Sequence, residues 1–113
     1  MRLFIFVLND SDKLSDILAG FVEIGITGAT ILDSVGMGHF LSRNLPIFAA
    51  FKPLMRESRS KNRTIVSVVN DPAKIDRAIA LIEEICGPLD ESGSGIAFTI
   101  PVEAVRGLKP EIP

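Results

Sequence analysis

Reactive and metal-binding side chains are scarce in this sequence, which has one cysteine and one histidine among 113 residues. A single cysteine, Cys86, excludes an internal disulfide framework and cannot by itself form a metal site. His39 has no second histidine and no Glu-x-x-His pair to work with, so it is expected in a loop. Asp33 is expected to be solvated or paired at an interface rather than to act as a base. These scarcities favour a protein that is not an enzyme and has no metal centre, with Cys86 as a small buried apolar residue on a helix.

Long apolar runs are also absent from the sequence. The apolar run within residues 1–8 is too short for the core of a signal peptide with its cleavage site, and too short to cross a membrane. The sequence therefore predicts a cytoplasmic protein.

The composition is apolar for a chain of this size, with 47% hydrophobic and 23% charged residues. A chain of this length is expected to form one domain, spanning residues 1–113, with one core. Small domains have much surface for their volume, so a surplus of apolar residues indicates that other subunits or a partner cover part of it. We therefore expect an oligomer.

Charge is unevenly distributed along the chain, although the net charge is only −2. Between Met37 and Arg63, six basic residues stand against one acidic residue, so this segment is basic and the remainder is acidic. A basic segment on an acidic body indicates a local interaction surface rather than a nucleic-acid-binding protein.

Hydrophobic periodicity predicts an α+β domain. Residues 2–8 alternate between two apolar faces, which is typical of a central strand covered on both sides, whereas residues 29–35 carry polar side chains on both faces. The predicted elements are a strand at 2–8, a helix at 14–22, strands at 29–35 and 64–69, a helix at 72–86 and a strand at 96–100. This βαββαβ order predicts a ferredoxin-like fold, with a four-stranded antiparallel sheet, two helices on one face, and a long loop between the second and third strands.

The long loop, residues 37–62, is apolar rather than linker-like. Pro46 is suited to the first turn of a short helix, and apolar residues recur after it at roughly helical spacing. A segment of this kind usually has a function or folds on a partner. We expect it to dock on a partner through two anchors and a basic flank, unless the anchors cover the protein's own subunits. The anchors are Phe48 and Phe51, and the flank is Arg56, Arg59 and Lys61.

Two glycine pairs are candidate ligand contacts. Gly36, Met37 and Gly38 follow the second predicted strand, and Gly93, Ser94 and Gly95 precede the last one within a loop that is expected to be flexible. A Gly-x-Gly segment allows a sharp turn, and its backbone N–H groups can face an anion. The same pattern is also common in loops that bind no ligand.

The chain resembles the PII nitrogen-regulatory signal-transduction proteins. The resemblance is carried by Glu23-Ile-Gly-Ile-Thr-Gly-Ala-Thr30 with the later Gly36-Met-Gly38, and by Gly93-Ser-Gly-Ile-Ala-Phe98 followed by Pro101-Val102. It implies a homotrimer whose sheets face a common axis. It also implies an adenine nucleotide in the cleft between subunits and a regulated target, either an enzyme or a membrane transporter. The matching ligand positions are Thr30, Gly36, Met37, Gly38, Gly93, Ser94, Gly95 and Arg106.

Several positions depart from the family pattern. Ile96 stands where the family has a lysine, Phe40 stands where it has a glutamine, and no tyrosine is present for modification. The first change removes a charge that pairs with phosphate. The resemblance therefore implies weakened ATP binding and no site for 2-oxoglutarate with magnesium. The alternative is another ferredoxin-like trimer with a site at the subunit boundary, either a metal-tolerance protein resembling the CutA group or a small enzyme.

Overall fold

The computed structural model describes residues 1–44 and 62–109. In chain order the elements are β1 (Arg2–Leu8), a 3-10 turn η1 (Ser11–Lys13), α1 (Leu14–Glu23), β2 (Thr30–Ser34), α2 (Met37–Asn44), β3 (Asn62–Val69), α3 (Pro72–Cys86), α4 (Leu89–Ser92) and β4 (Gly95–Pro101). The four strands form one antiparallel sheet in the order β2-β3-β1-β4. The predicted α+β, ferredoxin-like arrangement is confirmed.

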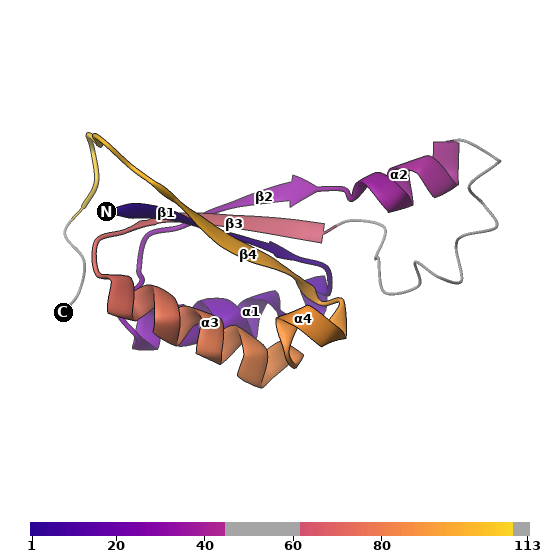
Figure 1. Ribbon diagram of the computed structural model, residues 1–113, viewed down its shortest axis with the longest axis horizontal. Coiled ribbons are helices and arrows are strands. Elements are labelled where there is room, and N and C mark those ends of the chain that lie inside the picture. Colours follow the sequence, from indigo (N-terminus) through magenta and orange to yellow (C-terminus); the bar gives the residue numbers. More distant parts are fainter. Residues whose placement is uncertain (45–61, 110–113) are drawn as a thin grey trace.

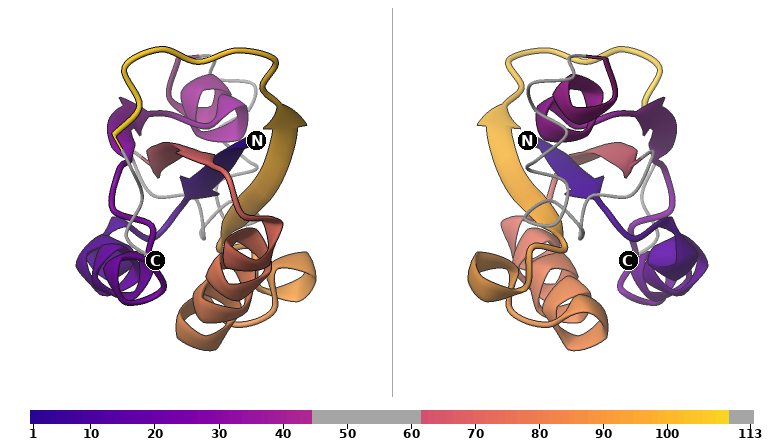
Figure 2. Two further views of the ribbon diagram at one scale, coloured as in Figure 1. Left: turned by 90° about the vertical axis from the view of Figure 1, so that its left-hand side faces the viewer. Right: turned by 90° about the vertical axis from the view of Figure 1, so that its right-hand side faces the viewer.

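Helices α1 and α3 lie side by side on one face of the sheet (Figures 1 and 2). The register places Phe6 of β1 opposite Ile65 of β3 and Ala97 of β4. Because successive side chains of a strand point to opposite faces, alternate residues of β1 face the helices and the others face away. We call these two sides the closed face and the open face.

The core fills the space between the closed face and the helices. The sheet contributes side chains that are essentially inaccessible, and the helices contribute apolar residues at helical spacing. These buried residues are Phe4, Phe6, Leu8, Ile65 and Val69 from the strands, Ile17 and Phe21 from α1, Ile26, and Ile75, Ala78 and Ile82 from α3. A Cβ at Gly20 would lie 2.2 Å from Leu81 Cδ2, so this glycine allows α1 and α3 to pack closely. Val22, near the end of α1, is exposed.

The two sheet-covering helices are joined by a reciprocal pair of lysine contacts. Lys13, at the start of α1, donates from Nζ to the carbonyl of Ile85 near the end of α3 at 3.1 Å. Lys74, in the first turn of α3, donates from Nζ to the carbonyl of Gly25 just after α1 at 3.2 Å. Carbonyls at a helix C-terminus have no partner within the helix, and a cation is favourable there. Gly25 has φ 92°, the left-handed conformation that is typical of a glycine just past a helix end.

Three sequence predictions about this architecture are wrong. The segment from Met37 to Asn44 is helix α2 rather than a loop, and His39 therefore lies in a helix. Gly36 suits the position before a helix, and the glycine inside α2 costs only about 1 kcal/mol, so the glycine pair does not prevent helix formation. Residues 89–92 form α4, which ends at Gly93 with φ 67°. Finally, β1 is covered on one side only within the chain, because its open-face residues Leu3, Ile5 and Val7 are half-buried.

The predicted helix beginning at Pro46 lies outside the described residues. Among the helices that the structure describes, none has both the length and the apolar character needed to cross a lipid bilayer.

Candidate functional site

The candidate ligand residues fall into two groups at opposite ends of the sheet. At one end β2 finishes and β4 begins, because the register pairs Ser34 with Asn62, and Leu8 with both Arg63 and Gly95. Both glycine segments therefore lie at this end, which we call the glycine end. They lie on opposite edges of the sheet, since β2 and β4 are its two outer strands.

The first glycine segment forms the entry to α2. The amide of Phe40 donates to the carbonyl of Gly36 at 3.0 Å, so helical hydrogen bonding begins at once after β2. Met37 is 77% exposed, and the Phe40 side chain is also largely exposed. The N–H groups of this segment are therefore those of a helix N-terminus rather than of an open loop.

The second glycine segment is held tightly to β1. The amide of Asn9 donates to the carbonyl of Ser94 at 2.8 Å, and Ser94 Oγ donates to the carbonyl of Cys86 at 3.0 Å. A Cβ on Gly95 would lie 2.0 Å from the carbonyl oxygen of Val7. This backbone atom cannot move without separating β1 from β4, so only glycine fits here. The predicted flexible loop is thus a fixed turn.

A chain of polar side chains connects the two glycine segments. Ser34 Oγ donates to Asn62 Oδ1, Asn62 Nδ2 donates to Asn9 Oδ1 at 3.5 Å, and Asn9 Nδ2 donates to the carbonyl of Gly93 at 2.8 Å. Ser34 Oγ also lies 2.8 Å from Thr64 Oγ1. These residues were not recognised in the sequence. Asn9 has the position of a turn residue, and Asn62 lies at the polar end of the long loop.

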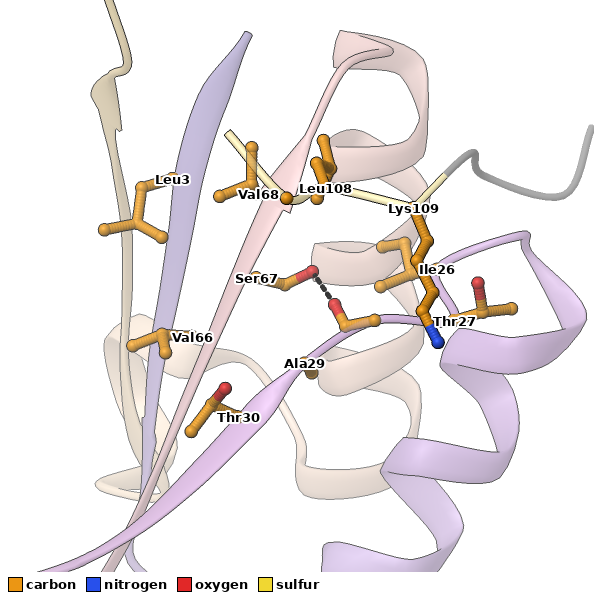
Figure 3. Close-up of a pocket in the computed structure, with 12 residues that line it drawn as sticks. Leu3, Ile26, Thr27, Ala29, Thr30, Val66, Ser67, Val68, Leu108 and Lys109 are labelled. Carbon is orange, nitrogen blue, oxygen red and sulfur yellow. Dashed lines mark hydrogen bonds between the residues drawn. The ribbon is translucent and has the colours of Figure 1, made fainter. Parts of the chain in front are cut away.

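At the other end of the sheet a cavity of about 610 Å³ contains Thr30 in its lining. Its walls come from residues 26–30 leading into β2, from residues 66–68 of β3, and from residues 107–109 of the C-terminal segment (Figure 3). Arg106 is exposed and directly precedes this last wall. We call this end the cavity end.

The cavity combines apolar walls with a few polar groups. Ser67 Oγ donates to the carbonyl of Gly28, which fixes the backbone at the start of β2. Lys109, an exposed residue of the C-terminal wall, supplies a cationic group to the lining. Such a site can receive a ligand with an apolar part and an anionic or hydroxyl-bearing part. Lys109 was not singled out in the sequence, because a lone lysine near a chain end carries no pattern.

The separation of these two ends means that one chain does not bring all eight candidate residues together. Thr30 pairs with Val66 at the beginning of β2, and Ser34 pairs with Asn62 at its end. Strand β2 therefore extends from the cavity end to the glycine end. A site containing both groups requires two copies of the chain.

The two departures from the PII pattern place apolar side chains at the glycine end. Ile96 follows Gly95 and is 58% exposed on the open face, and Phe40 is 53% exposed on α2. Neither side chain can pair with phosphate or bind a metal-coordinated acid.

The remaining candidates have ordinary environments. Asp33 forms an ion pair with Arg63 of the same chain, with 2.9 Å between Oδ1 and the guanidinium, so its described partner lies within the chain rather than at an interface. Both side chains are well exposed, so this pair contributes less than about 1 kcal/mol. Burial raises the pKa of the Cys86 thiol, with the Lys13 charge opposing this shift and Asp10 adding to it. Cys86 packs at the margin of the core, in keeping with its predicted structural role.

The expected partner-binding residues Phe48, Phe51, Arg56, Arg59 and Lys61 lie outside the described residues. Within residues 1–44 and 62–109, no group of three or more His, Cys, Asp or Glu side chains could hold a metal ion.

Comparison of the sequence with protein-family models and with curated proteins finds no match. The likeness to PII proteins therefore rests on the sequence motifs alone and stays a prediction.

Proposed function

We propose that the chain is the subunit of a PII-like regulatory homotrimer that is not itself an enzyme. In this proposal an adenine nucleotide binds in the cleft between subunits, and residues 37–62 contact a target enzyme or transporter. The observation that carries the proposal is the division of the candidate residues between the two ends of the sheet. Facing ends of neighbouring copies would unite Gly36 and Gly93–Gly95 of one subunit with Thr30 and Arg106 of the next.

The open face of the sheet supports the association of subunits. It carries an apolar surface that the chain's own helices leave uncovered, and monomeric proteins rarely expose large apolar patches. The register assigns to this face Leu3, Ile5 and Val7 of β1, Val66 and Val68 of β3, and Ile96, Phe98 and Ile100 of β4. Packing three such faces around an axis buries this surface without further residues.

The chemistry of the two ends supports a nucleotide as ligand. The cavity end supplies apolar walls, hydroxyl groups and the Lys109 ammonium, which suit a base and ribose. The glycine end supplies backbone N–H groups at the start of α2, which suit phosphate. Because Ile96 replaces a cationic partner, binding is weaker than in a typical PII protein.

The metal-binding alternative finds no support among the described residues. A CutA-like site would need several metal-ligating side chains together, and none are grouped in the part of the chain that the structure covers.

Subunit complementation provides the test. Gly36→Glu places a carboxylate at the glycine end, and Lys109→Glu reverses the charge at the cavity end, so each homotrimer loses nucleotide binding at every cleft. In mixed trimers some clefts join an intact glycine end to an intact cavity end. Calorimetry with ATP should then show binding that returns after the two variants are unfolded and refolded together.

The control is Ser15→Glu, on the exposed side of α1, which should bind ATP like the unaltered protein. A monomer by light scattering at micromolar concentration would contradict the trimer. If the mixed protein is a trimer but does not regain ATP binding, the shared site is contradicted and the trimeric assembly is not.

A further inference from the structure

The polar chain at the glycine end has a single direction of hydrogen bonding. The Gly93 carbonyl can only accept, so the Asn9 side chain must present its NH₂ group there. Asn9 Oδ1 is then left to accept from Asn62 Nδ2, and Asn62 Oδ1 is left to accept from Ser34 Oγ. The orientation of each amide therefore fixes the orientation of the next.

The same side chains can also form a chain of hydrogen bonds in which each donates in the opposite direction. If both amides turn over, Asn9 donates to Asn62 Oδ1, and Asn62 donates to Ser34 Oγ. The Ser34 hydroxyl then donates to Thr64 Oγ1, which already lies 2.8 Å away. Two acceptors are then left without a donor, because Asn9 Oδ1 faces the Gly93 carbonyl oxygen, while the other groups keep a partner. The two states therefore differ at the second glycine segment, where the reversed state needs a donor from outside the chain.

We propose that Asn9 and Asn62 form an amide relay that couples the turn after β2 to the turn before β4. A ligand or partner that presents N–H or O–H groups to the Gly93 carbonyl and to the reversed Asn9 Oδ1 would permit both amides to turn over. The reversal changes what Ser34 donates to, three residues before the first residue of α2. This coupling does not depend on the nucleotide or on the trimer.

The relay lies beside the entry to α2, where a change in its hydrogen bonds would alter the contacts of this helix. Asn62 is only 8% exposed, so the reversal occurs away from bulk water. Its Nδ2 lies 3.7 Å from the position that a Cβ on Gly36 would occupy, so the amide lies beside the entry to α2. The 3.5 Å hydrogen bond between the two asparagines is the longest of the relay. Two discrete arrangements biased from both ends are the physical requirement for coupling.

Three asparagine-to-aspartate variants of the full chain test the relay, because each replaces one NH₂ group by an acceptor. Asn9→Asp breaks the Gly93 contact directly and sets the scale of the effect. Asn62→Asp acts from the far side, since its carboxylate can only accept and therefore forces Asn9 to turn its NH₂ group away from Gly93. Asn70→Asp makes the same chemical change at an exposed turn outside the relay and is the matched control.

The readout is backbone amide hydrogen exchange by NMR at Asn9, whose N–H donates to the carbonyl of Ser94. Relative to the unaltered protein, exchange should rise by roughly two- to tenfold in Asn9→Asp and by a similar factor in Asn62→Asp. It should remain unchanged in Asn70→Asp. Lowering the pH to about 4, near the usual carboxyl pKa, should reduce the effect of Asn62→Asp, because a protonated acid can again donate to Asn9.

The relay is overturned if Asn62→Asp behaves like Asn70→Asp, or if it raises exchange equally throughout the central strand. A direct measurement needs no variant. A hydrogen-bond scalar coupling between Asn9 Nδ2 and the Gly93 carbonyl carbon is expected in the unaltered protein. Its absence would overturn the proposal even if Asn62→Asp failed to fold.

Discussion

The two faces of the sheet are built from the same strands and from similar residues, yet they have opposite environments. On the closed face Phe4, Phe6 and Leu8 are fully buried. On the open face Ile96 and Phe98 are 58% and 42% exposed, although they are equally apolar. The difference arises because α1 and α3 cover only one side (Figure 2). Apolar alternation on both faces of a strand therefore shows that both faces need cover, but it does not say which molecule provides it.

Changing the closed face should have the largest effect. Phe6→Ala removes a fully buried ring and leaves a cavity between the sheet and the helices, which should lower the free energy of unfolding by about 3–5 kcal/mol. Chemical denaturation followed by circular dichroism measures this. Phe98→Ala makes the same change on the open face and is the matched control. Equal losses in both variants at high dilution would mean that the two faces do not differ in the single chain.

Adding a charge to the open face beside the second glycine segment should have the next largest effect. Ile96→Lys restores a cation at the glycine end and should tighten ATP binding by roughly ten- to a hundredfold, the value of a charge-assisted phosphate contact. Calorimetry measures the change. Ser15→Lys adds the same charge on the exposed side of α1, away from the open face, and should not tighten binding. Tight binding by the unaltered protein would show that backbone N–H groups suffice.

Truncation on the open face should mainly weaken association. In the proposed trimer Phe98→Ala removes apolar surface that is buried between subunits, costing about 1 kcal/mol per subunit. Light scattering over a dilution series should show dissociation at a higher concentration than for the unaltered protein. Ser15→Ala, on the exposed side of α1 and away from the open face, should leave the dissociation range unchanged. An unshifted range for Phe98→Ala would mean that the open face is not the contact.

The smallest expected effect concerns Cys86, in the helical layer below the closed face. Burial raises the pKa of its thiol, so alkylation by iodoacetamide at pH 8 should be slower than for the same cysteine in the denatured chain. The stabilisation linked to this thiol is present below its unfolded pKa and is lost as pH rises through the higher folded value. Lys13→Met should slow alkylation further, because the Lys13 charge opposes the shift. Faster alkylation in the folded protein would contradict this assignment.

The helices were predictable where local chemistry marks both their periodicity and their ends. Asp71 caps α3 from its side chain at 2.9 Å, and Gly87 ends it with positive φ. Helix α2 was missed because glycines flank its first residue and suggest a turn. The reciprocal contacts of Lys13 and Lys74 were not predictable, since each joins residues far apart in the chain.

The candidate site was predictable only as a set of residue types. The glycine segments were recognisable because backbone conformations that need glycine leave a mark in the sequence. Their arrangement at one end of the sheet, with Thr30 at the other, depends on strand register. Asn9 and Asn62 were not recognised, because an asparagine in a turn has many local uses and its partner is set by the fold.

The sequence by itself determined the order of the four strands and of the two helices that cover the sheet, the ferredoxin-like topology and the excess of apolar surface, because these follow from side-chain periodicity and local backbone preference. Only the tertiary structure decided which face of the sheet the helices cover, that the candidate ligand residues divide between two ends, and that Asn9 and Asn62 join the glycine segments. These features depend on pairings between residues far apart in the chain, such as Thr30 with Val66, and Asn9 with Asn62 and with Gly93. No local pattern specifies such contacts, since they form only when the whole sheet has closed into register.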